Sequence, residues 1–144
     1  MQRERENRQF LAGVPLHDNV DVTADLSQAC ADAELLVLAA PSQYMRSLLE
    51  KVGRLSLPSK MIYVNVAKGL EVETSKRMSE VVSEILGDVH YAVLSGPSHA
   101  EEVARDVPSA VVCASPEAKV ARTVQSIFMN NLFRVYTSDD VIGV

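Results

Sequence analysis

The stretch Leu94-Ser95-Gly96-Pro97-Ser98-His99-Ala100-Glu101-Glu102-Val103 decides most of what this sequence predicts. It completes an apolar run, residues 91–94, that is typical of a buried strand, and its Gly-Pro pair predicts a sharp turn into a helix. Pro97 suits the first helical position because its missing N–H is not needed there. Gly96 lets the backbone approach a ligand because glycine has no Cβ atom. Ser98 adds a hydroxyl beside the N–H groups of a helix start, which favours an anionic or carbonyl ligand at a sheet edge.

Patterns typical of strands and helices alternate on both sides of this turn. Continuous apolar runs predict buried strands, and apolar residues spaced three and four apart predict helices. The expected strands cover residues 34–40, 61–66, 91–94, 110–114 and 132–137. The expected helices cover residues 41–53 and 74–86, and a third begins at residue 115 with Val120, Val124, Ile127 and Phe128 on its apolar side. This order predicts an α/β fold, a doubly wound and mostly parallel sheet with helices on both faces.

The remaining segments carry weaker signals. Residues 7–25 are rich in turn-forming residues, so we expect a loop there, with a short strand at 20–23. Residues 139–144 are expected to begin a further helix. The six glycines are never separated by a single residue, so the sequence contains no GxGxxG dinucleotide loop, and it contains no P-loop.

Composition narrows the class of protein. The 144 residues are one domain by length, and a net charge of −5 argues against a general nucleic-acid binder. No apolar run reaches the ~18 residues that span a bilayer, so we expect no membrane insertion. Cys30 and Cys113 lie in apolar surroundings without CxxC spacing, which predicts two buried free thiols of a cytoplasmic protein. The three histidines lack metal-ligand spacing, so no metal site is expected.

Three strand-to-helix turns are expected at one edge of the parallel sheet. They are residues 40–44, 67–69 and 95–98, and they bring Tyr44, Lys68 and Ser98 to the place where α/β sheets bind ligands. A lysine beside helix starts suits a phosphate group, and an aromatic residue suits a ring. Each residue also has a plainer interpretation: Lys68 as a solvated lysine beside a turn glycine, Tyr44 as a cover of the sheet edge, and Ser98 as a helix cap.

Six motifs in order along the chain resemble the bacterial-type NAD(P)-dependent glycerol-3-phosphate dehydrogenases. They are residues 6–7 with 10–13, 22–26, 38–43, 64–71 with Thr74, 94–103, and 133–137 with 140–144. The resemblance implies an oxidoreductase that interconverts dihydroxyacetone phosphate and sn-glycerol 3-phosphate with NAD or NADP. It further implies an incomplete Rossmann-like sheet, a cytoplasmic enzyme of glycerol-3-phosphate metabolism and phospholipid biosynthesis, and allows a homodimer.

The resemblance also implies roles for individual residues. Lys68, Gly96 and Ser98 would contact the substrate, and Tyr44, Lys68 and Ala100 the cofactor. The catalytic lysine of the family is expected beyond Val144, so no residue here is assigned as catalytic. Residues 1–144 would form part of an N-terminal dinucleotide-binding domain, without its first glycine-rich strand–helix unit and without the C-terminal helical catalytic domain. We therefore expect this polypeptide alone to be inactive.

Two other functions are weighed against this one. The missing glycine loop favours a non-catalytic remnant or a module that binds a nucleotide or a partner. A related two-domain hydroxy-acid dehydrogenase is the second alternative, and the spacing of Lys68-Gly69 from Gly96-Pro97-Ser98 argues against it.

Overall fold

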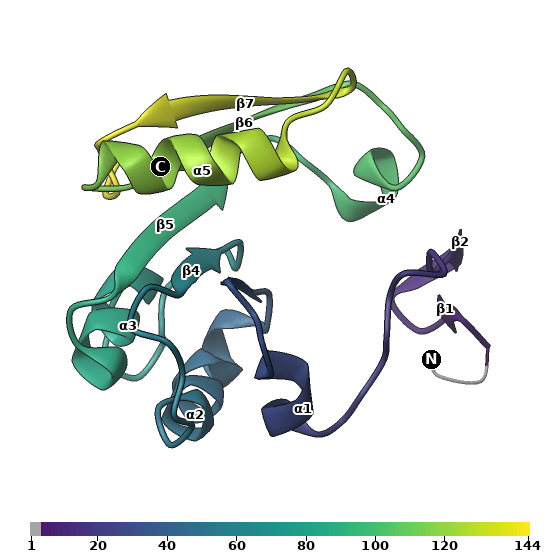
Figure 1. Ribbon diagram of the computed structural model, residues 1–144. Coiled ribbons are helices and arrows are strands. Elements are labelled where there is room, and N and C mark those ends of the chain that lie inside the picture. The colour runs from purple at the N-terminus through teal and green to yellow at the C-terminus, as the bar shows by residue number, and fades with distance from the viewer. Residues whose placement is uncertain (1–3) are drawn as a thin grey trace.

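A computed structural model describes residues 4–144 and shows a five-stranded sheet with helices packed on both of its faces (Figure 1). The strands of this sheet are β3 (Leu35–Leu38), β4 (Ile62–Asn65), β5 (His90–Ser95), β6 (Ser109–Ala114) and β7 (Phe133–Ser138). The helices are α1 (Leu26–Cys30), α2 (Ser42–Val52), α3 (Met78–Leu86), α4 (Ala100–Val103) and α5 (Ala118–Phe128). A separate hairpin pairs β1 (Glu6–Asn7) with β2 (Leu11–Pro15).

The strands lie side by side in the order β3-β4-β5-β6-β7, and three of their four pairings are parallel. The expected mostly parallel sheet is therefore confirmed. The single antiparallel pairing is that of β6 with β5, and β7 runs parallel to β6. The connection from β5 to β6 holds only the four-residue α4, which buries no residue and so does not act as a crossover helix over the sheet.

Two apolar cores, one on each face of the sheet, hold the helices in place. On one face, α2 and α3 pack through residues that include Met45, Leu49, Val52, Val81 and Val82. On the other face, α5 packs through Val120, Ala121 and Val124 onto β4 to β7. Helices on both faces are thus confirmed. Ile127, expected in the core, is 58% exposed because the buried stripe of α5 runs through Val120, Val124 and Phe128.

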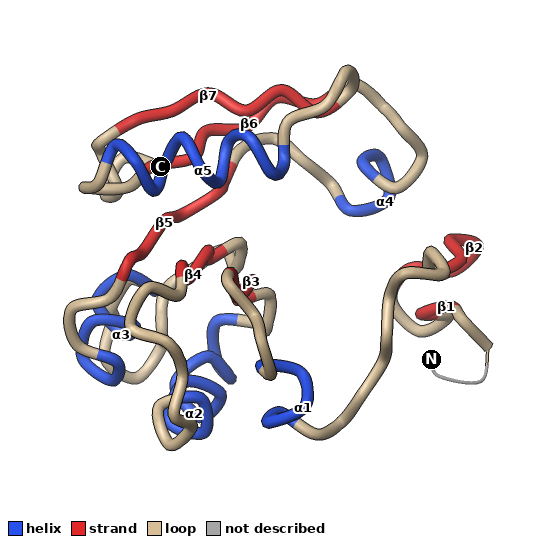
Figure 2. Tube along the Cα trace, viewed as in Figure 1, coloured by secondary structure: helices blue, strands red, loops and turns tan. Residues whose placement is uncertain are grey.

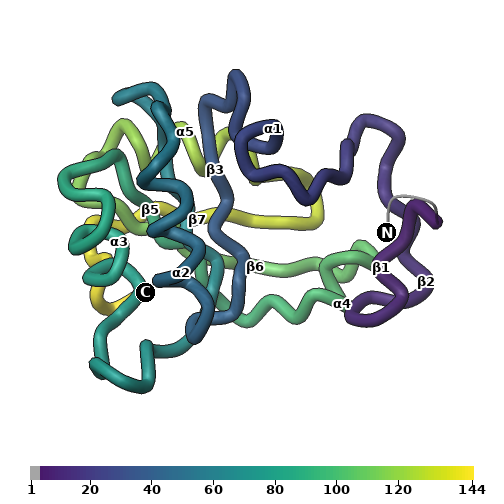
Figure 3. The backbone as a smooth tube through the Cα atoms, turned by 90° about the horizontal axis from the view of Figure 1, so that it is seen from below, coloured from purple at the N-terminus to yellow at the C-terminus, as the bar shows by residue number. Residues whose placement is uncertain are grey.

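The N-terminal part differs most from the sequence prediction. Residues expected to form a loop contain the β1–β2 hairpin, followed by a long loop to α1 (Figure 2). The expected short strand at 20–23 is wrong. Val20 instead closes a turn, since its N–H donates to His17 O at 2.9 Å and its carbonyl accepts from Arg5 Nη1 at 2.7 Å. The hairpin and α4 lie on the same side of the molecule, opposite α3 and the C-terminus (Figures 1 and 3).

Side-chain capping explains two further local differences. Asp25 caps α1, which the sequence reasoning missed, because its carboxylate accepts from the N–H groups of Ser27 and Gln28. At the other end, residues 139–144 form a turn and no helix. Asp140 Oδ1 accepts from the N–H groups of Ile142 and Gly143, so a side chain closes this turn where a helix would use backbone carbonyls.

Strand β3 is the outer strand of the sheet on the side of α1 (Figure 3). Its residue Val37 is 41% exposed, which leaves apolar surface at this edge. Cys30 and Cys113 are both buried and free, in agreement with prediction. Among the described residues, no helix is both long and apolar enough to cross a membrane, and no three His, Cys, Asp or Glu side chains gather as a metal site.

Candidate functional site at the carboxyl edge of the sheet

The turns that follow β3, β4 and β5 lie at the same edge of the sheet, as the sequence predicts. The three strands are parallel, and the register pairs Leu38 with Asn65 and Asn65 with Val93. The residues that come next, 40–44, 67–69 and 95–98, therefore leave the sheet side by side. This edge is where open α/β sheets bind their ligands.

A buried amide shapes the turn after β4. Asn65 is 2% exposed, its Nδ2 donates to the carbonyl oxygen of Ala67 at 3.0 Å, and its Oδ1 accepts from Ala67 N at 3.3 Å. Because one side chain satisfies both backbone groups of Ala67, the chain turns tightly immediately before Lys68.

Lys68 connects two of the three turns. Its ammonium Nζ donates to the carbonyl oxygen of Gly96 at 2.9 Å, although 28 residues separate the two. The side chain is exposed to solvent, but this bond holds its charge at the start of the 96–98 turn. The ammonium of Lys68 is therefore not directed only into water.

The reason for glycine at position 96 is the neighbouring strand. A Cβ atom there would lie 2.9 Å from both Ala110 O and Val111 Cα, which is closer than van der Waals contact allows. The Gly96 carbonyl also accepts from Ser98 N at 2.9 Å and faces Ser98 Oγ at 3.4 Å. Ser98 therefore turns its hydroxyl toward Gly96, and the first turn of α4 has no side-chain cap.

Two cavities meet at Lys68. The larger, about 490 Å³, lies beside Lys68, Ser98 and Ala100 and is otherwise mostly apolar. Its apolar wall consists of Val37, Val66, Leu94, Val103, Val111, Phe128 and Phe133. The smaller, about 310 Å³, is more polar and includes Lys68, Gly69, Asn65, Ser95 and Arg77. Volumes of this size are typical of small-molecule and cofactor sites.

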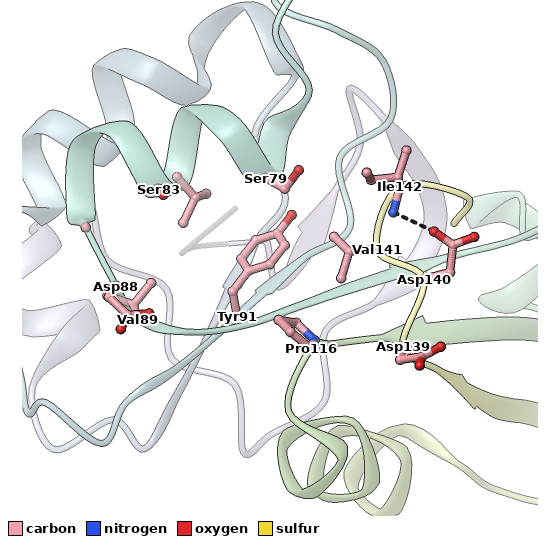
Figure 4. A pocket seen from close by; sticks show the side chains of 12 residues that line it. Ser79, Ser83, Asp88, Val89, Tyr91, Pro116, Asp139, Asp140, Val141 and Ile142 are labelled. Atoms are coloured by element: carbon pink, nitrogen blue, oxygen red, sulfur yellow. Dashed lines mark hydrogen bonds between the residues drawn. The ribbon is translucent and has the colours of Figure 1, made fainter.

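A third cavity continues the smaller one along α3 (Figure 4). It measures about 380 Å³ and shares Ser79, Tyr91, Val141 and Ile142 with its neighbour. The ring of Tyr91 stands at its centre, with the hydroxyl directed toward Ser79. Burial raises the pKa of Tyr91 above its ordinary value.

Tyr44 is the one predicted site residue that stands apart. It lies in the first turn of α2, is 67% exposed, and lines none of these three cavities of the described residues. The structure therefore brings Lys68, Ser98 and Ala100 to one cavity, with Gly96 bonded to Lys68. Tyr44 belongs to the neighbouring turn at the same edge, but its side chain is exposed and lines none of these cavities.

The sequence reasoning missed a polar cluster beside the site. Arg46 of α2 donates from Nε and Nη2 to the two carboxylate oxygens of Glu71, both at 2.8 Å, and Thr74 Oγ1 donates to the same carboxylate. Hydrogen bonds from Arg46 and then from Thr74 lower the pKa of Glu71 from its ordinary 4.5 to about 2. The signal in the sequence was the placement of Glu71 three residues after Lys68. The burial of its side chain, at 7% exposure, is seen only in the structure.

Comparison with known proteins points to one family. The family model described as "NAD-dependent glycerol-3-phosphate dehydrogenase N-terminus" matches residues 1–121. A relative named glycerol-3-phosphate dehydrogenase [NAD(P)+], from Syntrophomonas wolfei, is 49% identical over 100% of this chain and 43% of its own length. A second of the same name, from Chlorobium limicola, is 46% identical over 98% of this chain and 43% of its length.

The solved structures agree. The crystal structure of glycerol-3-phosphate dehydrogenase from Coxiella burnetii superposes with a TM-score of 0.93 at 31% identity, over 99% of this chain and 43% of that one. A pyrroline-5-carboxylate reductase from the same organism, at 16% identity and a TM-score of 0.63, shares the fold alone. The chain thus spans about 43% of the length of the curated relatives that it matches.

Proposed function

Because the chain belongs to the NAD-dependent glycerol-3-phosphate dehydrogenase family, we propose that it supplies the cofactor-binding part of an enzyme that interconverts sn-glycerol 3-phosphate and dihydroxyacetone phosphate. The cofactor is NAD or NADP. The complete enzyme, meaning this sequence joined to the segments that its relatives carry outside the matched region, performs the reaction, and this chain alone does not.

The contact from Lys68 Nζ to Gly96 O carries this proposal. It fixes a cation where the turns after β4 and β5 meet, and both proposed ligands are phosphate-bearing anions. A charge-assisted hydrogen bond to phosphate is about twice as strong as a neutral one. Lys68, Gly96 and Ser98 are accordingly the proposed substrate contacts, with Lys68 shared between substrate and cofactor.

The larger cavity suits part of a dinucleotide. Its apolar wall and its edge of Lys68, Ser98 and Ala100 match the pattern of a ring site with a few polar groups. The nicotinamide supplies the hydride when bound, and the chain's own residues bind and orient the cofactor and the substrate. Ala100 and Tyr44 complete the proposed cofactor contacts. The sequence holds no GxGxxG. We therefore assign the pyrophosphate loop to the segments that the relatives carry outside the matched region, and we assign the family's catalytic lysine there as the resemblance implies.

We place this activity in the cytoplasm, where its product feeds phospholipid synthesis, and allow for a homodimer. The two buried free cysteines support a reducing compartment. The net charge of −5 supports a small-molecule substrate over a nucleic-acid partner.

Replacing Lys68 tests the proposal. In the complete enzyme, Lys68→Ala should raise KM for dihydroxyacetone phosphate by about tenfold or more, since a hydrogen bond to a charged group contributes about 1.5–3 kcal/mol. The matched control is Lys60→Ala, because Lys60 is an exposed lysine that precedes the other end of β4. Equal steady-state constants for the two variants would refute the assignment.

A further inference from the structure

The segment that follows Lys68 is clamped onto α2 by two side chains of that helix. Residues 70–77 close on themselves through a bridge between Leu70 and Arg77, and Glu71 N donates to Lys76 O at 2.9 Å. Gly69, with φ +99°, makes the sharp bend between Lys68 and this loop. The orientation of Lys68 therefore depends on where the loop is held.

Gln43 holds the backbone of the loop. Its Nε2 donates to Leu70 O at 2.8 Å, and its Oε1 accepts from Val72 N at 3.0 Å. A single amide thus binds the loop on both sides of Glu71, as a strand neighbour would. Gln43 lies in the first turn of α2, within the 40–44 turn of the site.

Arg46 lies one helical turn further along α2 than Gln43. It holds the side chain of Glu71, the residue between Leu70 and Val72. Its planar guanidinium matches the carboxylate of Glu71 with two parallel hydrogen bonds of 2.8 Å, a geometry that lysine cannot reproduce. Glu84 of α3 accepts from the same guanidinium at 3.2 and 3.3 Å, so the arginine is itself held on its outer side. Since Glu71 is 7% exposed, this is the least solvated ion pair in the described part of the chain.

We propose that Arg46 and Glu71 are positioning residues for Lys68. The pair fixes the loop at Glu71, Gly69 transmits that position through its bend, and the ammonium of Lys68 is thereby held at 2.9 Å from Gly96 O. The inference rests on the proposed function, because it assumes that Lys68 binds the phosphate-bearing ligands. A displacement of about 1 Å at a binding group can cost a large factor in rate or affinity.

A double-mutant cycle in the complete enzyme tests the proposal. Glu71→Gln should raise KM for dihydroxyacetone phosphate about tenfold, with Arg46→Lys, which keeps the charge but loses the paired hydrogen bonds, showing an effect in the same direction. In a Lys68→Ala background, Glu71→Gln should cause no further rise, because the group that it positions is gone. Glu73→Gln is the matched control, since it removes an exposed carboxylate from the same loop.

The outcomes separate the proposed ligand binding by Lys68 from the proposed positioning role of Arg46 and Glu71. If Lys68→Ala leaves KM unchanged, the proposed function of Lys68 fails whatever Glu71 does. If Lys68→Ala raises KM but Glu71→Gln multiplies that rise by the same factor as in the wild-type background, Glu71 supports only the fold and the positioning role is wrong. If Glu71→Gln cannot be purified folded, the same cycle is run with Arg46→Lys and read by the same criterion.

Discussion

Lys68 and Gly96 are joined by a 2.9 Å hydrogen bond from the lysine ammonium to the glycine carbonyl, which ties the turn after β4 to the turn after β5. The carbonyl end of this bond is itself fixed, because Gly96 packs against the backbone of β6. The lysine end is fixed by Asn65 on one side and by the clamped loop on the other. A flexible side chain therefore presents its charge from a rigid position, which reduces the entropy lost on binding.

Gly96→Ala should lower the free energy of unfolding. The added Cβ would lie 2.9 Å from Ala110 O and Val111 Cα, and such overpacking costs about 1–3 kcal/mol. The unsubstituted protein is the reference, because alanine at the other glycines with a positive φ would be strained whatever the space around them. Urea denaturation should show a lower midpoint for Gly96→Ala. An unchanged midpoint would mean that β6 moves aside without cost.

The sheet and the helices that cover it were predictable because they rest on local apolar patterns. The runs at β3 and β4 and the stripes of α2 and α3 became the core with few changes. The direction of β6 was not predictable in this way, because an apolar run looks the same in either direction. The β1–β2 hairpin depends on specific hydrogen bonds, such as that from Gly13 N to Glu6 Oε1 at 2.7 Å, which no periodic pattern in the sequence predicts.

Only part of the site could be predicted, because only some of its features follow from local sequence patterns. Parallel strands place their turns together, so Lys68 and Ser98 could be assigned to one edge from topology alone. Lys68 and Gly96 meet through a side-chain-to-backbone bond, and Arg46 and Glu71 through an ion pair, each joining residues 25 or more apart. Such contacts depend on how the turns pack, which the sequence pattern does not contain. The prediction that Ile127 lies in the core was wrong, because three-residue spacing alone did not distinguish the edge of the apolar stripe of α5 from its centre.

The carboxylate of Glu71 should make stability depend on pH in the acid range. Its pKa is about 2 in the folded protein against an ordinary 4.5, so the folded state binds fewer protons in between. The stabilisation is complete above about pH 4.5 and is lost as the pH falls toward about 2. Glu71→Gln should flatten that decline when unfolding is followed at about pH 6 and about pH 3, whereas Glu73→Gln should not. A decline of unchanged steepness in Glu71→Gln would contradict the assignment.

Ser115 should be important for stability although it lies outside the site. It is 1% exposed, its Oγ donates to Tyr91 O at 2.7 Å, and it accepts from Glu117 N at 3.2 Å. Ser115→Ala leaves both groups without this partner, at a cost of about 1–3 kcal/mol. Ser126→Ala removes an exposed hydroxyl from α5 and should cost much less. Thermal unfolding of both variants provides the measurement, and an equal shift in Tm would contradict the role of Ser115.

Tyr44 should affect cofactor binding without affecting stability. Because its side chain is 67% exposed, Tyr44→Ala should change the free energy of unfolding by no more than about 0.5 kcal/mol. If the ring packs on the cofactor, the same variant should weaken NADH binding by the complete enzyme several-fold in a calorimetric titration. Unchanged affinity would remove Tyr44 from the cofactor contacts and leave it as a cover of the sheet edge.

In the proposed function, Lys68 presents its charge to the phosphate-bearing ligands. A crystal structure of the complete enzyme with NADH and a non-reacting substrate analogue tests this most directly. We expect Lys68 Nζ to lie within hydrogen-bond distance, about 2.7–3.2 Å, of an oxygen of the substrate analogue or cofactor, with Arg46 and Glu71 still paired. A structure in which both ligands are bound while Lys68 points into solvent, away from either, would contradict it.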